Sequence, residues 1–311
     1  MMKIGIDARF WNETGVGRYI RNLVGELSEI DKTNSYVLFM KSDDTKLFKP
    51  KNNRWSVIST DIHWHSLSEQ LHFSQILNQQ NLDLMHFPYF SIPIRYSRPY
   101  IVTIHDLILH HFATGEATTL PFQIYKLKLA GYKYIMNRAA RNAKRIITVS
   151  HATSKEIIDH LHVNPSKVSV IYEGVDPAIK NRKPYHKGTS YSPTGGLSPS
   201  EGRIAAKTEN RKHGKYFLHV GNVYPHKNAK RLIEAFSQVN SDGYSLLFVG
   251  KKDYFMQKLE KFVIKSNLEK KVLTPNQFPN LNRLDQSFLI LQKKWLFMNK
   301  NLRSYNKNWA T

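Results

Sequence analysis

The chain of 311 residues contains no cysteine, which excludes disulfide bonds and thiolate-ligated metal sites. No apolar run approaches the ~20 residues that span a bilayer. The first strand-like segment, Lys3-Ile4-Gly5-Ile6-Asp7, follows the initial methionines directly. Because no charged and then apolar leader precedes it, we expect a cytoplasmic protein rather than one secreted through a cleaved signal.

Acidic residues are scarce, with 24 Asp and Glu against 46 Lys and Arg, and the formal net charge is +22. Such an excess favours an anionic partner: a phosphorylated substrate, an anionic membrane surface or a nucleic acid. The sequence has no helix-turn-helix or zinc-finger spacing and no basic-aromatic pattern of an RNA-binding sheet. We therefore rank phosphate or membrane first and regard nucleic acid as unlikely.

One basic segment, Phe122 to Arg145, is helix-like and carries apolar residues along one side. Packing of that side on a sheet is the favoured interpretation, and peripheral attachment to anionic lipid is the alternative. The side consists of Leu129, Tyr132, Met136 and Ala140.

Hydrophobic residues make up 41% of the chain, enough for two domains with cores of their own. Over residues 1–176, strand-like and helix-like runs alternate, which predicts an α/β, Rossmann-like doubly wound domain with a parallel sheet. Ser150 is the expected N-cap of one helix. Strands are expected at Lys3–Asp7, Tyr36–Met40, Trp55–Ile58, Leu82–Phe87, Tyr100–His105, Arg145–Val149 and Val168–Tyr172, and helices at Gly17–Ile30, Phe122–Lys144 and Ala152–Leu161.

The alternation stops over residues 177–215, which are rich in Lys, Gly, Ser, Pro and Thr and predict a basic linker or insertion. It resumes over residues 216–270 with a second domain of the same class. Residues 271–311 contain no Glu and show weak periodicity, so we interpret them as an aberrant tail.

The second domain opens with a pattern typical of a phosphate site. Tyr216 to Val220 predict a buried strand, Gly221 a turn, and Ala229 to Val239 an amphipathic helix. Backbone N–H groups near Asn228 and the helix dipole attract an anion, and Lys227 adds a full charge. The alternative is an ordinary strand-turn-helix unit with a solvated lysine.

Six segments occur in the order seen in family 4 of the retaining glycosyltransferases. The chain resembles that family, and within it the mannosyltransferase-like enzymes of bacterial surface polysaccharides, over roughly residues 2–270. The segments are GIDARFW…TGVGRYIRNLV (5–24), HFPYFSIP (86–93), VTIHDL (102–107), ITVSHATSKEI (147–157), VIYEGVD (170–176) and FLHVGNVYPHKNAKRLIEAF (217–236).

The resemblance implies a GT-B architecture, in which two Rossmann-like domains hold the acceptor mainly on the first and a nucleotide-sugar donor mainly on the second. His105 would lie beside the donor sugar as the catalytic residue, although its position at a strand end is also typical of a structural histidine. Asp106 and Glu173 are candidates for further sugar contacts. Gly15 and Gly17, between the first strand and helix, would approach acceptor or donor phosphate, or serve the turn alone.

In the second domain, the resemblance implies a donor-phosphate site formed by Gly221, Asn222, His226 and Lys227. Lys227 would neutralise the pyrophosphate, which becomes the leaving group. Family members often carry Arg at the position of Asn222. The absence of that arginine weakens the expected phosphate site, and His226 would take over part of the phosphate binding.

Family members also carry two later glutamates in a Gly-rich loop, whereas the last glutamate here is Glu269. We hypothesise a frameshift or truncation near Lys271 and expect impaired activity. The leading function is therefore transfer of a hexose, with mannose the first candidate, from a nucleotide sugar to a glycan or lipid-linked acceptor. The alternatives are a non-catalytic remnant that binds glycan or membrane and, less favoured, a nucleic-acid-binding protein.

No cofactor or metal is expected. The pair His63 and His65, and the group His105, His110 and His111, have no third ligand at fixed spacing. The Asp-x-Asp motif that holds a metal-bound nucleotide sugar in the other major glycosyltransferase fold does not occur, which favours metal-independent transfer.

Overall fold

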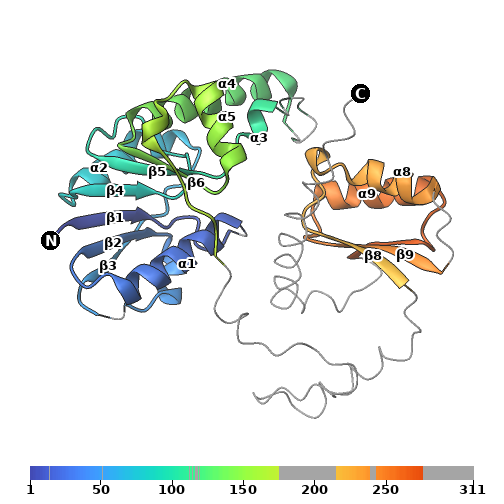
Figure 1. Cartoon of the computed structure of the whole chain (residues 1–311), viewed down its shortest axis with the longest axis horizontal. Helices are drawn as coiled ribbons and strands as arrows, with labels where there is room; N and C mark the ends of the chain where they lie inside the picture. Colours follow the sequence, from blue (N-terminus) through green and yellow to red (C-terminus); the bar gives the residue numbers. More distant parts are fainter. Residues whose placement is uncertain are drawn as a thin grey trace, which may run out of the picture. The chain divides into compact units, whose positions relative to one another are not determined.

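The computed structural model describes residues 1–13, 15–50, 52–111, 113, 115, 118, 120–174, 215–238 and 243–275. The chain divides into two compact units, Met1–Gly174 and Val175–Thr311 (Figure 1). The division falls two residues before the predicted boundary at 176. The predicted linker lies outside the described residues except for Lys215, which begins the first strand of the second unit.

The first unit contains a seven-stranded sheet in the order β3-β2-β1-β4-β5-β6-β7, with all pairs parallel. The order reverses between β1 and β4, the position where doubly wound sheets bind ligands outside the carboxyl ends of their strands. The strands are β1 (Lys3–Asp7), β2 (Ser35–Met40), β3 (Trp55–Ser59), β4 (Leu84–Phe87), β5 (Tyr100–Ile104), β6 (Arg145–Thr148) and β7 (Val168–Val170).

Helices connect these strands, as parallel pairing requires. Those of the first unit are α1 (Gly15–Ile30), α2 (Ser74–Asn78), α3 (Ile108–His111), α4 (Phe122–Asn142) and α5 (His151–Leu161), with a π-helix at Glu69–Phe73 and 3-10 helices at Ser42–Leu47 and Pro165–Lys167. The predicted strands and three predicted helices of this unit are all present, with ends that differ by at most two residues from the predicted ones.

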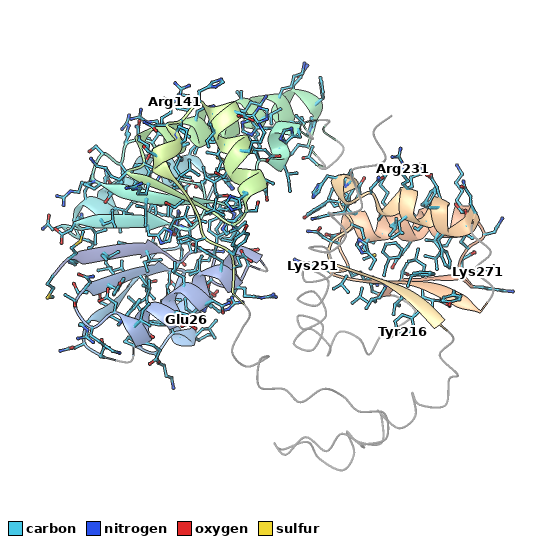
Figure 2. The ribbon with its side chains drawn as sticks, viewed as in Figure 1. Glu26, Arg141, Tyr216, Arg231, Lys251 and Lys271 are labelled. Carbon is cyan, nitrogen blue, oxygen red and sulfur yellow. The ribbon has the colours of Figure 1, made fainter. Side chains whose placement is uncertain are left out.

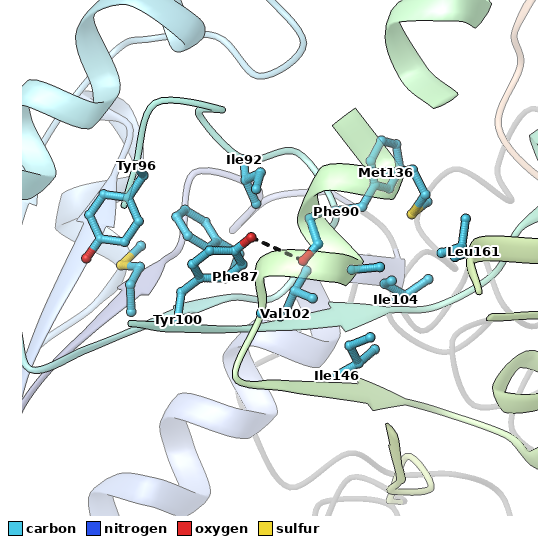
Figure 3. Packing of buried hydrophobic residues seen from close by; sticks show 14 of the residues in the cluster. Phe87, Phe90, Ile92, Tyr96, Tyr100, Val102, Ile104, Met136, Ile146 and Leu161 are labelled. Atoms are coloured by element: carbon cyan, nitrogen blue, oxygen red, sulfur yellow. Dashed lines mark hydrogen bonds between the residues drawn. The ribbon is translucent and has the colours of Figure 1, made fainter. Parts of the chain in front are cut away.

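Helices cover both faces of the sheet. Alternate side chains of β2 therefore enter two separate cores. Tyr36, Leu38 and Met40 pack in a core that includes α1, whereas Val37 and Phe39 pack in a core that includes α2, α4 and α5. Figure 3 shows this second core, where the hydroxyl of Tyr100 donates to the carbonyl oxygen of Ala139 on α4 at 3.2 Å.

The second unit has one parallel sheet in its described residues, ordered β10-β9-β8. Its core joins β9 to both helices, which lie on the same side of the sheet (Figure 1). The elements are β8 (Lys215–Val220), a 3-10 helix (Pro225–Lys227), α8 (Ala229–Gln238), β9 (Tyr244–Val249), α9 (Tyr254–Lys265) and β10 (Val272–Leu273).

The last strand, β10, lies where the sequence predicted the start of an aberrant tail. Val272 is fully buried and pairs with Leu246 of β9, so the sheet continues to at least Leu273. Beyond Pro275, the predicted tail lies outside the described residues.

Candidate functional site

His105 immediately follows β5, at the carboxyl edge of the first unit's sheet and next to the order reversal. Its Nε2 lies 2.9 Å from the carbonyl oxygen of Pro88. A carbonyl only accepts hydrogen bonds, so Nε2 carries a proton and donates it. The tautomer and the ring orientation of His105 are therefore fixed by backbone that follows β4.

The other ring nitrogen faces a carboxylate. Nδ1 of His105 lies 3.6 Å from Oε1 of Glu173, whose side chain is 51% exposed, whereas that of His105 is 14% exposed. This separation is too long for a direct hydrogen bond. Nδ1 and the Glu173 carboxylate are thus two polar groups with capacity for a ligand hydroxyl, and the fold brings them together from β5 and the segment after β7.

Two tyrosines pack around His105. The Tyr19 ring on α1 meets it edge-on at 5.0 Å, and the Tyr89 ring lies 6.4 Å away. The Tyr19 hydroxyl lies 3.1 Å from Thr103 Oγ1, which is also 2.9 Å from Nε2 of the buried His86. Burial, with a further contribution from Glu173, raises the pKa of Tyr19, so its hydroxyl stays protonated at neutral pH.

Asp106 is exposed, and its Oδ1 accepts the Ile108 N–H at the start of α3 at 3.0 Å. Burial raises the pKa of Tyr89, and the charge of Asp106 adds to that shift, which places this carboxylate near the same cluster. The structure thus brings His105, Asp106 and Glu173 together. The two tyrosines were not predicted as site residues, because no sequence spacing links them to His105.

Gly15 and Gly17 lie within the first turn of α1, so the helix begins two residues before its predicted start at Gly17. A Cβ at Gly17 would lie 2.5 Å from the carbonyl oxygens of both Phe10 and Trp11, so a side chain is excluded there. A Cβ at Gly15 would meet nothing within 4 Å. Gly17 therefore serves close packing, the structural alternative for this motif, and Gly15 leaves open space at the helix start.

The segment between β1 and α1 is held by a charge network that sequence analysis missed. Arg9 is fully buried and donates to Asp7 through Nε at 2.8 Å and Nη2 at 2.6 Å, and to Glu69 Oε1 at 2.6 Å. Glu69 also accepts from Ser91 Oγ at 2.7 Å. These paired charges tie the segment directly after β1 to the π-helix.

In the second unit, Gly221 ends β8 with a positive φ of 131°, a conformation that disfavours residues with a Cβ. Its N–H donates to the carbonyl oxygen of Val249 at 2.8 Å. Asn222 follows on the surface. The predicted turn at the carboxyl end of the strand is therefore present, with Gly221 as its structural requirement.

Among the amides near Asn228, those of Lys227 and of Asn228 itself already have acceptors. The N–H groups of Lys227 and Asn228 donate to Tyr224 at 2.8 Å and Pro225 at 3.0 Å within the 3-10 helix. The first bond of α8 runs from Leu232 N–H to the Asn228 carbonyl at 3.1 Å. By helix geometry, the amides without an intrahelical acceptor are those of residues 229–231.

Lys227 is exposed just ahead of these amides. Burial lowers the pKa of His219 on β8, and the charge of Lys227 lowers it further, so the ammonium lies near that strand. His226 is half-buried, with its ring 5.9 Å from Tyr224. A cation and helix-start amides at the end of a strand are suited to a phosphate.

Within the described residues, no group of three or more His, Asp or Glu side chains has the geometry to hold a metal ion. His110 instead contacts the Tyr132 hydroxyl at 3.0 Å, and His111 lies 3.3 Å from Glu156. His65 Nδ1 lies 3.3 Å from Ser91 Oγ, and His63 Nδ1 lies 2.7 Å from the Trp64 carbonyl.

Comparison with known proteins places both units in one class. Residues 14–179 match the model of Glycosyltransferase Family 4, and residues 200–293 match that of Glycosyl transferases group 1. Together with the parallel α/β architecture, these matches define a glycosyltransferase fold of the GT-B type. The chain belongs to glycosyltransferase family 4.

A curated relative is the O-antigen chain mannosyltransferase RfbU of Salmonella typhimurium (strain LT2), 24% identical over 210 residues. The match covers 67% of this chain and 48% of the relative, so the chain spans about half the relative's length.

Two solved structures share the fold. Anabaena Alr3699/HepE in complex with UDP-glucose has a TM-score of 0.56 at 17% identity, over 88% of this chain and 68% of that one. WaaG, a glycosyltransferase of lipopolysaccharide biosynthesis, has a TM-score of 0.55 at 13% identity, over 87% and 69%.

Proposed function

We propose that this chain is a retaining glycosyltransferase that moves a hexose, with mannose the first candidate, from a nucleotide sugar to a glycan or lipid-linked acceptor in polysaccharide biosynthesis. The observation that carries the proposal is the pair of glycosyltransferase matches, one over each unit. The mannose assignment draws support from the O-antigen mannosyltransferase among its relatives.

The chemistry assigns separate tasks to the two units. Lys227 and the amides that begin α8 stabilise the negative charge that develops on the nucleoside diphosphate as it leaves. On the first unit, His105 Nδ1 and Glu173 take hydroxyls of the sugar or the acceptor. His105 is held by Pro88 and by the Tyr19 ring, so it needs little reorganisation during transfer.

Transfer is proposed to be independent of metal. The Lys227 ammonium neutralises the diphosphate charge that a metal ion would otherwise neutralise. With a lipid-linked acceptor, the protein would act in the cytoplasm at the inner membrane face. No helix of the described residues combines the length and apolarity needed to cross a membrane.

Turnover with a panel of nucleotide sugars tests the proposal. We expect release of nucleoside diphosphate from one donor, unchanged by a chelator, and a product whose anomeric configuration matches that of the donor by NMR. If no donor binds, the non-catalytic alternative, a protein that holds glycan or membrane through its first unit, replaces this proposal.

His105 provides a residue-specific test. We expect His105→Ala to lower kcat roughly 100-fold, because a contact that strengthens in the transition state is lost, and to leave the affinity for free nucleoside diphosphate unchanged. His72→Ala, an exposed histidine on the π-helix, is the matched control. Equal rates for the two variants would remove His105 from the mechanism.

A further inference from the structure

Two polar side chains, His86 and Thr103, are buried on the side of the first unit's sheet that faces α1. His86 is the register partner of Ile6 on β1, and Ile6 packs in the core that includes α1. Thr103 lies between Val102 and Ile104, which pack in the opposite core, so the Thr103 side chain also points towards α1. Thr103 is 0% exposed and His86 is 4% exposed. The two polar groups therefore lie between the sheet and the helix.

A chain of hydrogen bonds joins this pair to α1. Nε2 of His86 lies 2.9 Å from Oγ1 of Thr103, which lies 3.1 Å from the hydroxyl of Tyr19. Tyr19 is in the second turn of α1, about two turns before Glu26, which is labelled in Figure 2. Burial lowers the pKa of His86 to about 3, with a further contribution from His105, so the ring at the inner end of the chain stays neutral.

The Tyr19 ring in turn restrains His105. The two rings meet edge-on, with their centres 5.0 Å apart and an angle of 87° between their planes. The bond from His105 Nε2 to the Pro88 carbonyl fixes the position of one nitrogen, but a single hydrogen bond leaves the ring free to tilt about it. The edge-on contact opposes that tilt. The Tyr19 ring thereby controls the direction of Nδ1, the nitrogen that faces Glu173.

Mutual satisfaction of buried polar groups is the structural alternative for this chain of hydrogen bonds. Replacing both members of a buried hydrogen-bonded pair by apolar groups of the same shape is often nearly neutral, so stability alone does not require His86 and Thr103. A fully bonded buried network does make its members more rigid. The member of this network next to the candidate site is Tyr19, so the rigidity is supplied beside His105.

We propose that Tyr19, anchored through Thr103 to His86, is a positioning residue that keeps the His105 imidazole oriented with Nδ1 towards the ligand. Tyr19 acts through His105 and needs no contact with substrate. Its part in transfer rests on the proposed function, whereas its restraint of the imidazole does not. The restraint is therefore measured without a donor, and its effect on transfer is measured separately.

Nitrogen NMR of the histidine side chains in the full chain tests the restraint. In the wild type, we expect His105 to show a single tautomer with the proton on Nε2. Tyr19→Phe keeps the ring and Thr103→Val keeps the shape, yet each breaks the chain, so the His105 nitrogen shifts should move towards the average of the two tautomers. Tyr36→Phe, which removes a hydroxyl bond to Asp31 near the start of β2, is the matched control and should leave the shifts unchanged.

Steady-state kinetics with the donor that is turned over measures the consequence for transfer. We expect Tyr19→Phe and Thr103→Val each to lower kcat about fivefold with KM for the donor unchanged, because misorientation affects the transition state more than substrate binding. Since both changes break one chain, the double variant should also lose about fivefold rather than roughly 25-fold. Thr103→Ser restores the hydroxyl and should retain the wild-type kcat.

Three results would overturn the proposal. The first is a set of His105 nitrogen shifts that Tyr19→Phe leaves as they are in the wild type, a test that stands even if Thr103→Val does not fold. The second is a double variant whose loss of kcat is the product of the two single losses. The third is a Thr103→Ser variant as slow as Thr103→Val. An absence of turnover with every donor would instead contradict the proposed function, and the nitrogen shifts would still decide the role of Tyr19.

Discussion

At the scale of single residues, Gly17 shows how a motif serves packing before chemistry. We expect Gly17→Ala to destabilise the first unit by about 1–3 kcal/mol. The new Cβ would lie 2.5 Å from the carbonyl oxygens of two consecutive residues, and relieving this clash requires a shift of the backbone. Urea unfolding followed by circular dichroism measures this loss.

Gly25→Ala, in the same helix, is the matched control. A Cβ there meets nothing within 4 Å, so the gain in helix propensity should stabilise the protein by about 0.5–1 kcal/mol. If both substitutions shift stability in the same direction, the proposed close approach at Gly17 is wrong.

His86 predicts a pH dependence of stability. Burial, with a contribution from His105, lowers the pKa of His86 to about 3, against about 6.5 in the unfolded chain. Its contribution to stability is therefore complete above pH 6.5 and declines as the pH falls towards 3, because the unfolded chain takes up a proton that the folded chain refuses.

His86→Asn keeps a side chain able to bond Thr103 but removes the titration. Between pH 6.5 and 4, we expect the wild type to lose stability more steeply than the variant, by up to about 1.4 kcal/mol per pH unit for the one proton. Parallel stability curves in urea would show that His86 is not the titrating group.

The positions of candidate site residues in the fold could be predicted from the sequence where a local pattern fixes them. Gly221 at the turn and His105 at a strand end are of this kind. The neighbourhood of His105 could not be predicted. Tyr19 and Glu173 lie close to it only because of the order of the strands and the way α1 packs on the sheet. Which amides near Asn228 already have acceptors could not be predicted either, because Pro225 starts a 3-10 helix that uses the N–H groups of Lys227 and Asn228.

At the scale of elements, the strands of the first unit were predictable because parallel strands buried on both faces give short apolar runs. The π-helix at Glu69–Phe73 has no comparable sequence signal. Helix α9, which was not predicted, does have a sequence signal. Asp253 caps it by accepting from Phe255 and Met256 N–H groups at 3.0 Å, and Met256, Leu259 and Val263 form its buried side.

The start of α5 gives a prediction at this scale. Ser150 Oγ accepts the Thr153 N–H at 3.1 Å, so Ser150→Ala should cost about 1 kcal/mol of stability. Ser154→Ala, inside the same helix, should be neutral or slightly stabilising because alanine has the higher helix propensity. Thermal unfolding of the two variants side by side checks the difference, and equal melting temperatures would contradict the cap.

At the scale of the whole molecule, six weak motifs in a fixed order identified the family, and models over both units confirm it. Each motif alone is compatible with an ordinary strand-turn-helix unit. Their order carries the information, because it reflects the succession of strand ends along two α/β sheets.

The central claim is that the start of α8 and Lys227 hold the diphosphate of a sugar nucleotide. Calorimetric titration of the full chain with GDP-mannose, UDP-glucose and the corresponding nucleoside diphosphates tests it, with Lys227→Gln as the variant and Lys261→Gln, an exposed lysine on α9, as the control. We predict saturable binding that Lys227→Gln weakens roughly 10- to 100-fold and Lys261→Gln leaves unchanged. Equal affinity in both variants, or no binding by the folded wild type, would contradict the account.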